Sequence, residues 1–529
     1  MKGVHMTQAI DHGFGRWRAI FWPIHKYELK KLIPMLLIAF CIAFVYTILR
    51  DTKDTIVVSA IDELALPFLK LFGTLPAAIL FMLIYSKLSN KLSKESLFYV
   101  IIVPFLIFFG IFAFVLYPNR EVLQPTATAQ YLLSISPEGF YSAIKCFEHW
   151  TLSLFYILSE LWGSAVLSLL FWGFANEIVK TNEAKRFYTL FTMGFNLALI
   201  FSGPLIWYSS VYGKSLAGTG VDTWQVTLNY LMTLVMVAGV TIVACYWWMN
   251  RNVLTDKQLY DPESNPTKAK KSKHKMGVIE GLVYLSKSKY LLCIALLVIG
   301  YGMSINLVEV VWKGQLKLAY PNKNDYSAFM GMFSMSTGIF TIAMTFVGGY
   351  IIRTRSWGRA ASLTPMALLI TGIGFFVFIV FRDYMVGYIA FIGTTPVMMA
   401  VIIGMVQNIA SKSTKYSLFD PTKEMAYIPL DDESKVKGKA AIDVVGARAG
   451  KSGGALIWNF LAITLVSVFG KDIGKAIATP IVAVLMIGII MAWLWAVRSL
   501  NKQYNELTGE PDELEANPKV RASTVIIKA

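Results

Sequence analysis

The sequence predicts an all-α membrane protein with about twelve transmembrane helices. Of its 529 residues, 56% are hydrophobic and only 16% are charged, whereas soluble domains average about 25% charged residues. The apolar residues gather in runs of about 20, the length that a helix needs to cross a bilayer. The alternation of period two that a membrane β-barrel requires is missing. Because backbone groups in lipid must bond within their own segment, these runs are expected to be helices.

The expected spans follow the apolar runs in order. They cover residues 32–49, 64–85, 96–117, 150–174, 188–209, 226–249, 290–312, 327–351, 360–381, 386–409, 451–469 and 476–497. Lysine and arginine gather in alternate connecting loops, so the positive-inside rule predicts that both termini and the long central loop are cytoplasmic. One loop departs from this rule, because residues 313–326 face outward yet carry three lysines.

The spans divide into two six-helix halves, which favours a major-facilitator-like architecture with a site near the membrane midplane. The expected parts are a cytoplasmic interfacial segment at 1–31, an N-terminal half at 32–249, a basic linker at 250–289, a C-terminal half at 290–497 with a cytoplasmic loop at 410–450, and a polar tail at 498–529. The linker is expected to touch anionic lipid headgroups. Nucleic-acid binding is not expected, because the linker lacks a folded scaffold and interleaved aromatic residues.

Only four charged residues lie inside these spans, namely Lys70, Glu160, Glu309 and Lys451. A charge at the bilayer centre costs about 2.5–3.5 kcal/mol on insertion scales, so each is a candidate functional residue. Simpler interpretations remain open. Lys70 lies close enough to a span end to reach the headgroups, Glu309 and Lys451 lie near span ends, and any Lys–Glu pair can be purely structural.

Motifs for enzymes are missing. The stretch "VGARAGKSGG" at 445–454 departs from a phosphate-binding loop, because Val445 stands where the first glycine is required. Lys451 and the following glycines are still expected to open a helix, whose N-terminus suits an anion. The four cysteines lack metal-ligand or redox spacing. We therefore predict no catalytic residues, no metal site and no cofactor, and a receptor role would leave the four intramembrane charges unexplained.

Several long blocks resemble one known family, the non-mitochondrial ATP/ADP translocases of obligate intracellular bacteria and plastids. The blocks are "YTILRDTKDTIVVSA", "ELWGSAVLSLLFWGFAN", "YGMSINLVEVVWK", "YSAFMG", "QNIASKSTKYSLFDPTKEMAYIPLDDESKVKGKAAIDVV" and "GKSGGA". The lack of a plastid presequence makes the chain similar to members from chlamydia-like parasites. The resemblance implies an antiporter that imports host ATP in exchange for ADP across the bacterial inner membrane. A proton-coupled nucleotide symporter or a broad-specificity nucleotide exchanger of the same family is the alternative.

The resemblance also implies that two lysines and two glutamates are essential, and these fall on the four intramembrane charges. We expect Lys70 and Lys451 to hold the phosphates, and Glu160 and Glu309 to couple or gate the exchange. In the empty carrier the lysines are expected to pair with the glutamates, which would resist switching without substrate. In the symporter alternative, Glu160 would be the proton site.

Further candidates are less distinct. Arg50, Lys53 and Lys313 are expected to be secondary phosphate or gate contacts, or else ordinary loop charges. Adenine needs an apolar slot with a few polar groups, and the candidates in nearby spans, each of which could equally be packing, are Tyr156, Phe195, Asn196 and Asn306. The polar stretch 415–430 is expected to form a cytoplasmic gate or a brace between the halves. The expected partners are ATP, ADP, membrane lipids and, as an open possibility, phosphate, for a chain that plausibly acts as a monomer.

Overall fold

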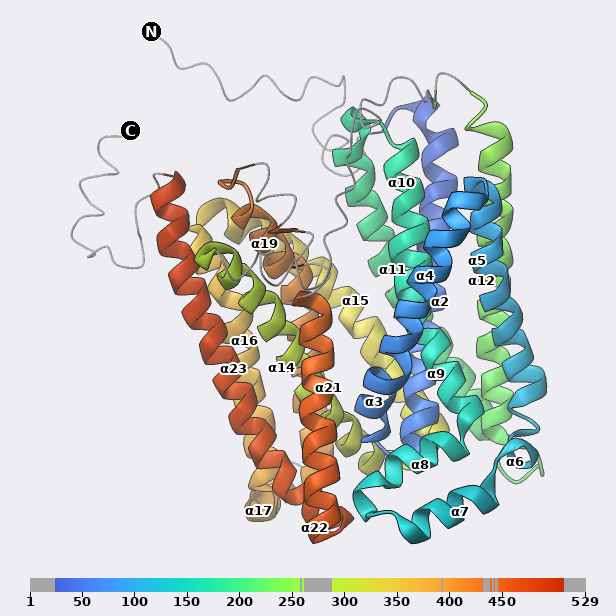
Figure 1. The fold of residues 1–529 in the computed structure, drawn as a ribbon, viewed down its shortest axis with the longest axis vertical. Coiled ribbons are helices and arrows are strands. Elements are labelled where there is room, and N and C mark those ends of the chain that lie inside the picture. Colours follow the sequence, from blue (N-terminus) through green and yellow to red (C-terminus); the bar gives the residue numbers. More distant parts are fainter. Residues whose placement is uncertain are drawn as a thin grey trace.

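The computed structural model describes residues 24–256, 259–260, 288–391, 393–431, 438–439, 442 and 446–508, and its regular structure over these ranges is helical. Within these ranges, twelve helical segments are long and apolar enough to cross a membrane, which confirms the predicted all-α membrane fold. Figure 1 shows them as two bundles, with the N-terminal half in blue to green and the C-terminal half in yellow to red.

Each half is built from long helices interrupted by short π-helical segments (η). The N-terminal half contains α2 (Leu29–Ala60), α3 (Ala65–Phe68), η2 (Leu69–Thr74), α4 (Leu75–Lys91), α5 (Lys94–Ile111), η3 (Phe112–Leu116), α6 (Arg120–Leu123), α7 (Thr126–Ile135), α8 (Tyr141–Glu148), α9 (Trp150–Trp162), η5 (Gly163–Phe171), α10 (Trp172–Ile178), α11 (Thr181–Ser215) and α12 (Thr223–Asn252). The C-terminal half contains α14 (Lys289–Ala319), α15 (Lys323–Thr354), α16 (Trp357–Val380), α17 (Val386–Ala390), α18 (Pro396–Thr414), η8 (Lys415–Phe419), α19 (Asp420–Ala426), α21 (Ala447–Leu461), η10 (Ala462–Val466), α22 (Ser467–Phe469) and α23 (Lys471–Thr508).

Two helices continue beyond the charges that we expected to end them. Helix α2 runs to Ala60 and includes Arg50 and Lys53, and α14 runs to Ala319 and includes Lys313. The interpretation of these three residues as ordinary loop charges is therefore wrong. The helices can continue because the charged side chains find partners inside the protein. The excess of lysine in the expected outer loop 313–326 is explained in part, since Lys313 and Lys317 are helical.

The tenth span lies later in the chain than predicted. It covers Pro396–Ala426 instead of 386–409, because Pro396 starts α18, and η8 and α19 continue it. The loop expected at 410–450 thus begins after Ala426, and several of its residues lie outside the described ranges. The indole of Trp357 donates to the carbonyl of Thr422 (2.9 Å), and Tyr290 donates to that of Ala426 (2.7 Å). These contacts attach the polar stretch to the C-terminal half.

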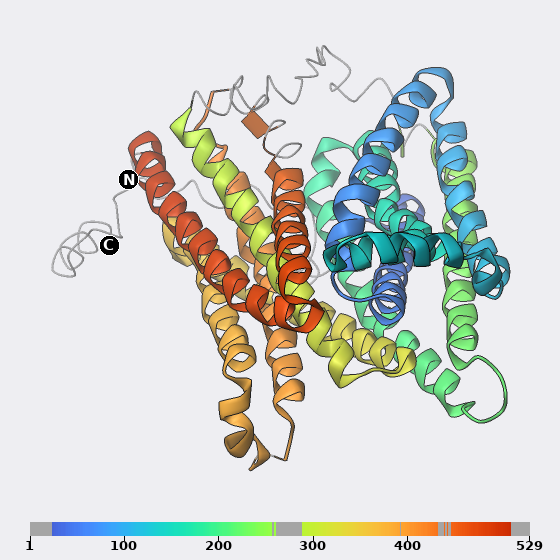
Figure 2. The ribbon, with the colours of Figure 1, turned by 60° about the horizontal axis from the view of Figure 1, so that its bottom comes forward.

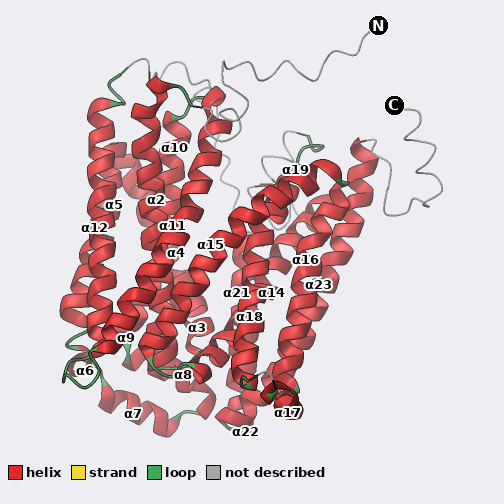
Figure 3. Ribbon diagram, turned by 180° about the vertical axis from the view of Figure 1, so that it is seen from behind, coloured by secondary structure: helices red, strands yellow, loops and turns green. Residues whose placement is uncertain are grey.

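The two halves meet at one end of the molecule and diverge at the other. We call the end that carries α7, α8 and α22 the α7 side, and the opposite end, where α2 begins, the N-terminal side. Figures 1 and 3 show the bundles in contact on the α7 side and separated on the N-terminal side. Helices α7 and α8 lie across the end of the N-terminal half and extend toward the C-terminal half (Figure 2).

The contact between the halves is apolar and close. Val57, Ile61 and Leu66 from the N-terminal half belong to the same buried cluster as the core of the C-terminal half. Helices α11 and α15 cross at a pair of glycines, where a Cβ atom on Gly203 would lie 2.4 Å from the carbonyl oxygen of Gly331. Such small residues let two membrane helices approach at backbone distance. The crossing holds the halves together beside the buried charges.

Candidate functional site

A continuous series of ion pairs connects the two halves. Lys53 on α2 pairs with Glu160 on α9 (3.2 Å) and with Asp54 (2.8 Å). Asp54 pairs across the contact with Lys313 on α14 (2.7 Å). We call this series, completed below by Glu309 and Lys70, the charge chain.

The charge chain crosses back to the N-terminal half through α14. Lys313 pairs with Glu309 one turn earlier (2.9 Å), and Glu309 pairs with Lys70 on η2 (2.9 Å). The four-residue spacing of Glu309 and Lys313 places both on one face of the helix. Lys70 also donates to the amide oxygen of Asn306 (2.8 Å). Its π-helical segment departs from α-helical geometry, as helices often do at functional sites.

The middle of the charge chain is dry, and its ends are partly open. The side chains of Lys53 and Asp54 are 3% exposed and that of Lys313 is 1% exposed. Those of Glu160, Glu309 and Lys70 are 21%, 24% and 16% exposed. Removing one partner of a buried ion pair leaves an uncompensated charge, so the central pairs depend on one another. The outer members can be reached by a charged ligand.

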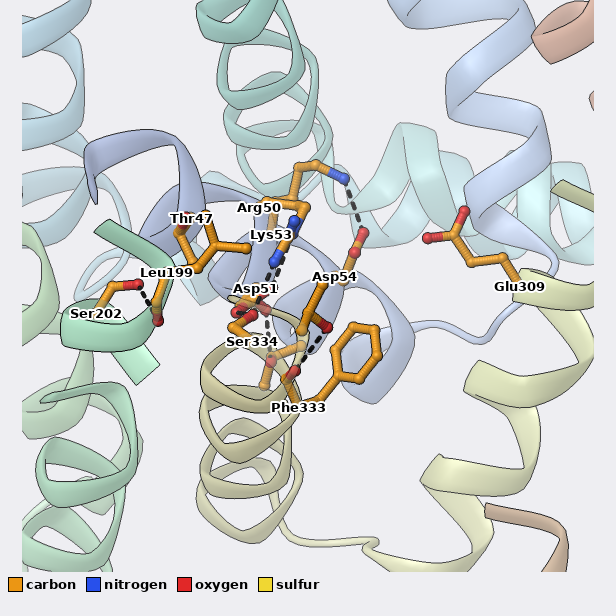
Figure 4. Close-up of polar contacts among 12 residues, drawn as sticks. Thr47, Arg50, Asp51, Lys53, Asp54, Leu199, Ser202, Glu309, Phe333 and Ser334 are labelled. Carbon is orange, nitrogen blue, oxygen red and sulfur yellow. Dashed lines mark hydrogen bonds and ion pairs between the residues drawn. The ribbon is translucent and has the colours of Figure 1, made fainter. Parts of the chain in front are cut away.

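A second polar cluster lies beside the charge chain on α2 and α15. Arg50 binds Asp51 (3.0 Å) and donates to the hydroxyl of Ser334 (2.7 Å), and that hydroxyl donates to Asp51. Figure 4 shows Arg50, Lys53 and the two aspartates on successive turns of α2, with Ser334 against Asp51. Ser334 belongs to the C-terminal half, so this cluster is a further connection between the halves.

Lys451 differs from our expectation in two ways. It lies inside α21, which begins at Ala447, so the residues after it do not form a free helix N-terminus. Its glycine neighbours serve packing, since a Cβ atom on Gly302 of α14 would lie 3.0 Å from the Cα of Gly450. Lys451 is exposed, and it has no ion pair in the described part of the chain. Of the two lysines expected to pair with the two glutamates, Lys70 does so with Glu309, whereas Glu160 pairs with Lys53.

Sequence reasoning missed several charges of the site. Asp51 and Asp54 were hidden in a presumed loop, although the run "RDTKD" directly continues an apolar helix. Lys412 was assigned to the loop at 410–450 but lies in the last turn of α18. Its Nζ lies 4.6 Å from the centre of the Phe333 ring, a cation–π contact.

The four adenine candidates divide into two pairs. Tyr156 lies under Lys53, whose Nζ is 4.0 Å from the ring centre, and Asn306 binds Lys70. Both therefore belong to the charge chain. Phe195 packs on the rings of Phe171 and Trp172, and Asn196 donates to a carbonyl of its own helix. The structure thus brings only the first two to the charges.

A third group of ion pairs closes the α7 side. Lys471 pairs with Asp62 (3.1 Å) and Lys475 pairs with Glu63 (2.6 Å), each pair joining the two halves. Burial would raise the pKa of Asp62, but the charges of Lys475 and Lys471 and a hydrogen bond from Ser142 outweigh it and lower that pKa. Asp62 therefore stays ionised in the closed arrangement.

The sequence matches one family along almost its whole length, since the profile of the TLC ATP/ADP transporter family covers residues 7–504. Curated relatives include "ADP,ATP carrier protein 1" of Chlamydia trachomatis, 54% identical over 94% of this chain and 93% of the relative. "ADP,ATP carrier protein 2, chloroplastic" of Arabidopsis thaliana is 50% identical over 94% of this chain and 78% of the relative. "ADP,ATP carrier protein 1" of Rickettsia prowazekii is 43% identical over 96% of this chain and 100% of the relative.

Solved structures resemble the fold at low sequence identity. A bacterial homologue of the iron transporter ferroportin aligns with a TM-score of 0.54 at 11% identity, covering 89% of this chain and all of that one. A transporter of the POT family aligns with a TM-score of 0.51 at 11% identity, covering 89% of this chain and 96% of that one. These likenesses confirm a major-facilitator-like architecture of two six-helix halves.

Proposed function

The chain belongs to the TLC ATP/ADP transporter family, and we propose that it exchanges ATP for ADP across a membrane by alternating access between its two halves. The observation that carries this proposal is the charge chain, which alternates in sign and crosses the contact between the halves twice. A nucleotide brings a flexible chain of negative charges. It can therefore compete with the carboxylates for the lysines.

The exposed end of the charge chain is where that competition starts. Lys70 is held by Glu309 and Asn306, and an ammonium is a point charge that suits a mobile phosphate chain. When a phosphate takes Lys70, the carboxylate of Glu309 keeps Lys313 as its partner. The link between the halves through Lys70 is then replaced by a link through the nucleotide.

The same pairs account for obligatory exchange. An empty carrier re-forms Lys70–Glu309 and is held in one arrangement, whereas a loaded carrier is not. Switching also requires the α7 side to open, which breaks Asp62–Lys471 and Glu63–Lys475. The bound nucleotide compensates for the lost charge contacts only while it remains in the site. The carrier without a nucleotide therefore switches back to the other arrangement slowly. As a result, one nucleotide leaves for each nucleotide that enters.

The protein is a multi-pass membrane protein with twelve candidate spans. We place it in a bacterial inner membrane with both termini in the cytoplasm, as the distribution of lysine and arginine favours. The N-terminal side, where the two bundles are separated, then faces the cytoplasm. ATP would enter the cell and ADP would leave. Both halves of the site come from one chain, which supports a monomer as the transport unit.

Uptake of labelled ATP into proteoliposomes tests this function. We expect uptake when the vesicles contain ADP and little uptake when they contain buffer alone. Equal uptake into both would contradict exchange. Uptake that instead follows an imposed pH gradient would favour the proton-coupled alternative. Glu160→Gln helps to distinguish the two, because uptake driven by a pH gradient should be lost in this variant if Glu160, the partner of Lys53, is also the proton site.

A further inference from the structure

The charges of the charge chain and of the residues around it do not cancel. Within the described part of the chain, this larger group of charges consists of six cations and four carboxylates. The cations are Arg50, Lys53, Lys70, Lys313, Lys412 and Lys451, and the carboxylates are Asp51, Asp54, Glu160 and Glu309. Each carboxylate pairs with at least one of Arg50, Lys53, Lys70 and Lys313. Among the residues that the structure describes, Lys412 and Lys451 have no carboxylate within ion-pair distance. This larger group therefore has two more positive than negative charges.

Lys412 is held beside the inter-half contact. Its ammonium rests on the ring of Phe333, and the next residue, Ser334, accepts a hydrogen bond from Arg50. Lys412 thus lies in the C-terminal half beside the residue that Arg50 binds from the N-terminal half.

The two unpaired lysines flank one helix. Helix α14, which carries Glu309 and Lys313, packs against both α18 and α21, the helices of Lys412 and Lys451. Lys70 and Lys313, in contrast, are already paired with carboxylates. An ammonium inside a membrane span without a carboxylate partner is unfavourable. Its presence at this position points to an anion that supplies the missing charge.

We propose that Lys412 binds the phosphate chain of the nucleotide, together with Lys451, and that its charge favours polyphosphates over a single phosphate. This inference rests on the proposed function for the identity of the ligand. The unpaired lysines receive the phosphates first, because no carboxylate must be displaced from them. Lys70 joins only when Glu309 has been displaced, so Lys412 acts in recognition and Lys70 in coupling.

Binding to the purified full-length protein tests the proposal, with ATP, ADP, AMP and tripolyphosphate as probes. For Lys412→Gln we expect the affinity for ATP and tripolyphosphate to fall about 10- to 100-fold, as for the loss of a charged hydrogen bond. The affinity for AMP should change much less. Lys412→Arg keeps the charge and should retain most of the affinity. Unchanged affinity of Lys412→Gln for ATP would overturn the proposal.

The matched control is Lys415→Gln. Lys415 lies three residues further on, and Asp420 already neutralises it (2.7 Å), so its loss should leave ATP affinity unchanged. The melting temperature without nucleotide separates binding from a structural role. Lys412→Gln should melt no lower than the unmodified protein but lose the stabilisation that ATP gives. A lower melting temperature together with unchanged ATP stabilisation would assign Lys412 a structural role and overturn the proposal.

A measurement on the unmodified protein covers the case in which Lys412→Gln does not fold. An amine-reactive acylating reagent should modify Lys412 in the empty protein, and ATP or tripolyphosphate should protect it, as read by mass spectrometry. Protection of Lys451 but not Lys412 would overturn the inference. If the protein exchanges no ATP for ADP in vesicles, the proposed function fails. Protection by tripolyphosphate would still support Lys412 as a polyphosphate-binding residue.

Discussion

The Nζ atom of Lys70, in the N-terminal half, lies 2.9 Å from a carboxylate oxygen of Glu309 in the C-terminal half. The two residues are far apart in the sequence, and each lies inside an apolar helix segment. Their pairing is the outermost link of the charge chain. In the proposed mechanism a nucleotide displaces this link, so its state would report whether the carrier is empty or loaded.

Loss of the ammonium at Lys70 should weaken phosphate recognition while leaving adenine recognition intact. For Lys70→Gln we expect the affinities for ADP and ATP to fall about 10- to 100-fold, the effect of losing a charged hydrogen bond. Competition by adenosine should change little. Binding assays with the three ligands measure this. Lys214→Gln is the control, because Lys214 pairs with Asp325 on the α7 side. An equal loss for adenosine would assign Lys70 a general structural role.

Neutralising Asp54 should destabilise the protein strongly. Asp54→Asn leaves Lys53 and Lys313 short of a carboxylate in a dry region, and breaking a buried pair typically costs about 3–5 kcal/mol. A lower melting temperature in detergent would show this. The double variant Asp54→Asn/Lys313→Gln removes one surplus charge and should recover part of the loss. Failure to recover any would contradict the coupling of these residues.

The α7 side should loosen at low pH. The folded protein lowers the pKa of Asp62, so its contribution to stability is present above the unfolded pKa and is lost as the pH falls through the folded pKa. Asp62→Asn should therefore melt at a lower temperature than the unmodified protein at neutral pH. The difference should shrink in acid, below the ordinary aspartate pKa of about 3.9. A difference that persists in acid would show that the ion pairs are not its cause.

The glycine crossing of α11 and α15 should not tolerate side chains. In Gly203→Val the new Cβ would meet the carbonyl of Gly331 at 2.4 Å, so the two helices would have to separate. We expect reduced melting temperature and reduced exchange. Gly349→Ala on α15 is the control, because a Cβ there meets nothing within 4 Å. Normal stability of Gly203→Val would show that this crossing is not close in the protein.

Much of the fold could be predicted from hydrophobic runs alone, since a bilayer requires long apolar helices. The ends of the spans could not be predicted in this way, as α2 shows. Its apolar run stops before Arg50, yet the helix continues through Asp51 and Asp54. It can continue because the positive charges of Arg50, Lys53 and Lys313 compensate the two carboxylates. That compensation comes from tertiary contacts, which no local pattern contains.

The site could also be predicted only in part, because the sequence shows which charges are unusual but not which residues they contact. Lys70, Glu160 and Glu309 were identified because a charge inside an apolar run is conspicuous, and the structure brings all three to the charge chain. Their pairing was predicted only in part. Lys70 pairs with a glutamate as expected, whereas Glu160 pairs with Lys53 and with neither of the two expected lysines. Lys412 escaped notice because a polar stretch follows it, so the end of the tenth span resembled a loop.

The release of labelled ADP from proteoliposomes, with and without external ATP, tests the central claim most directly. We compare the unmodified protein with Glu309→Gln, which removes the carboxylate that holds Lys70 in the empty carrier. The unmodified protein should release ADP only when ATP is outside, and Glu309→Gln should also release ADP into nucleotide-free buffer. If Glu309→Gln remained strictly dependent on external ATP while still transporting, the Lys70–Glu309 pair would not be the lock.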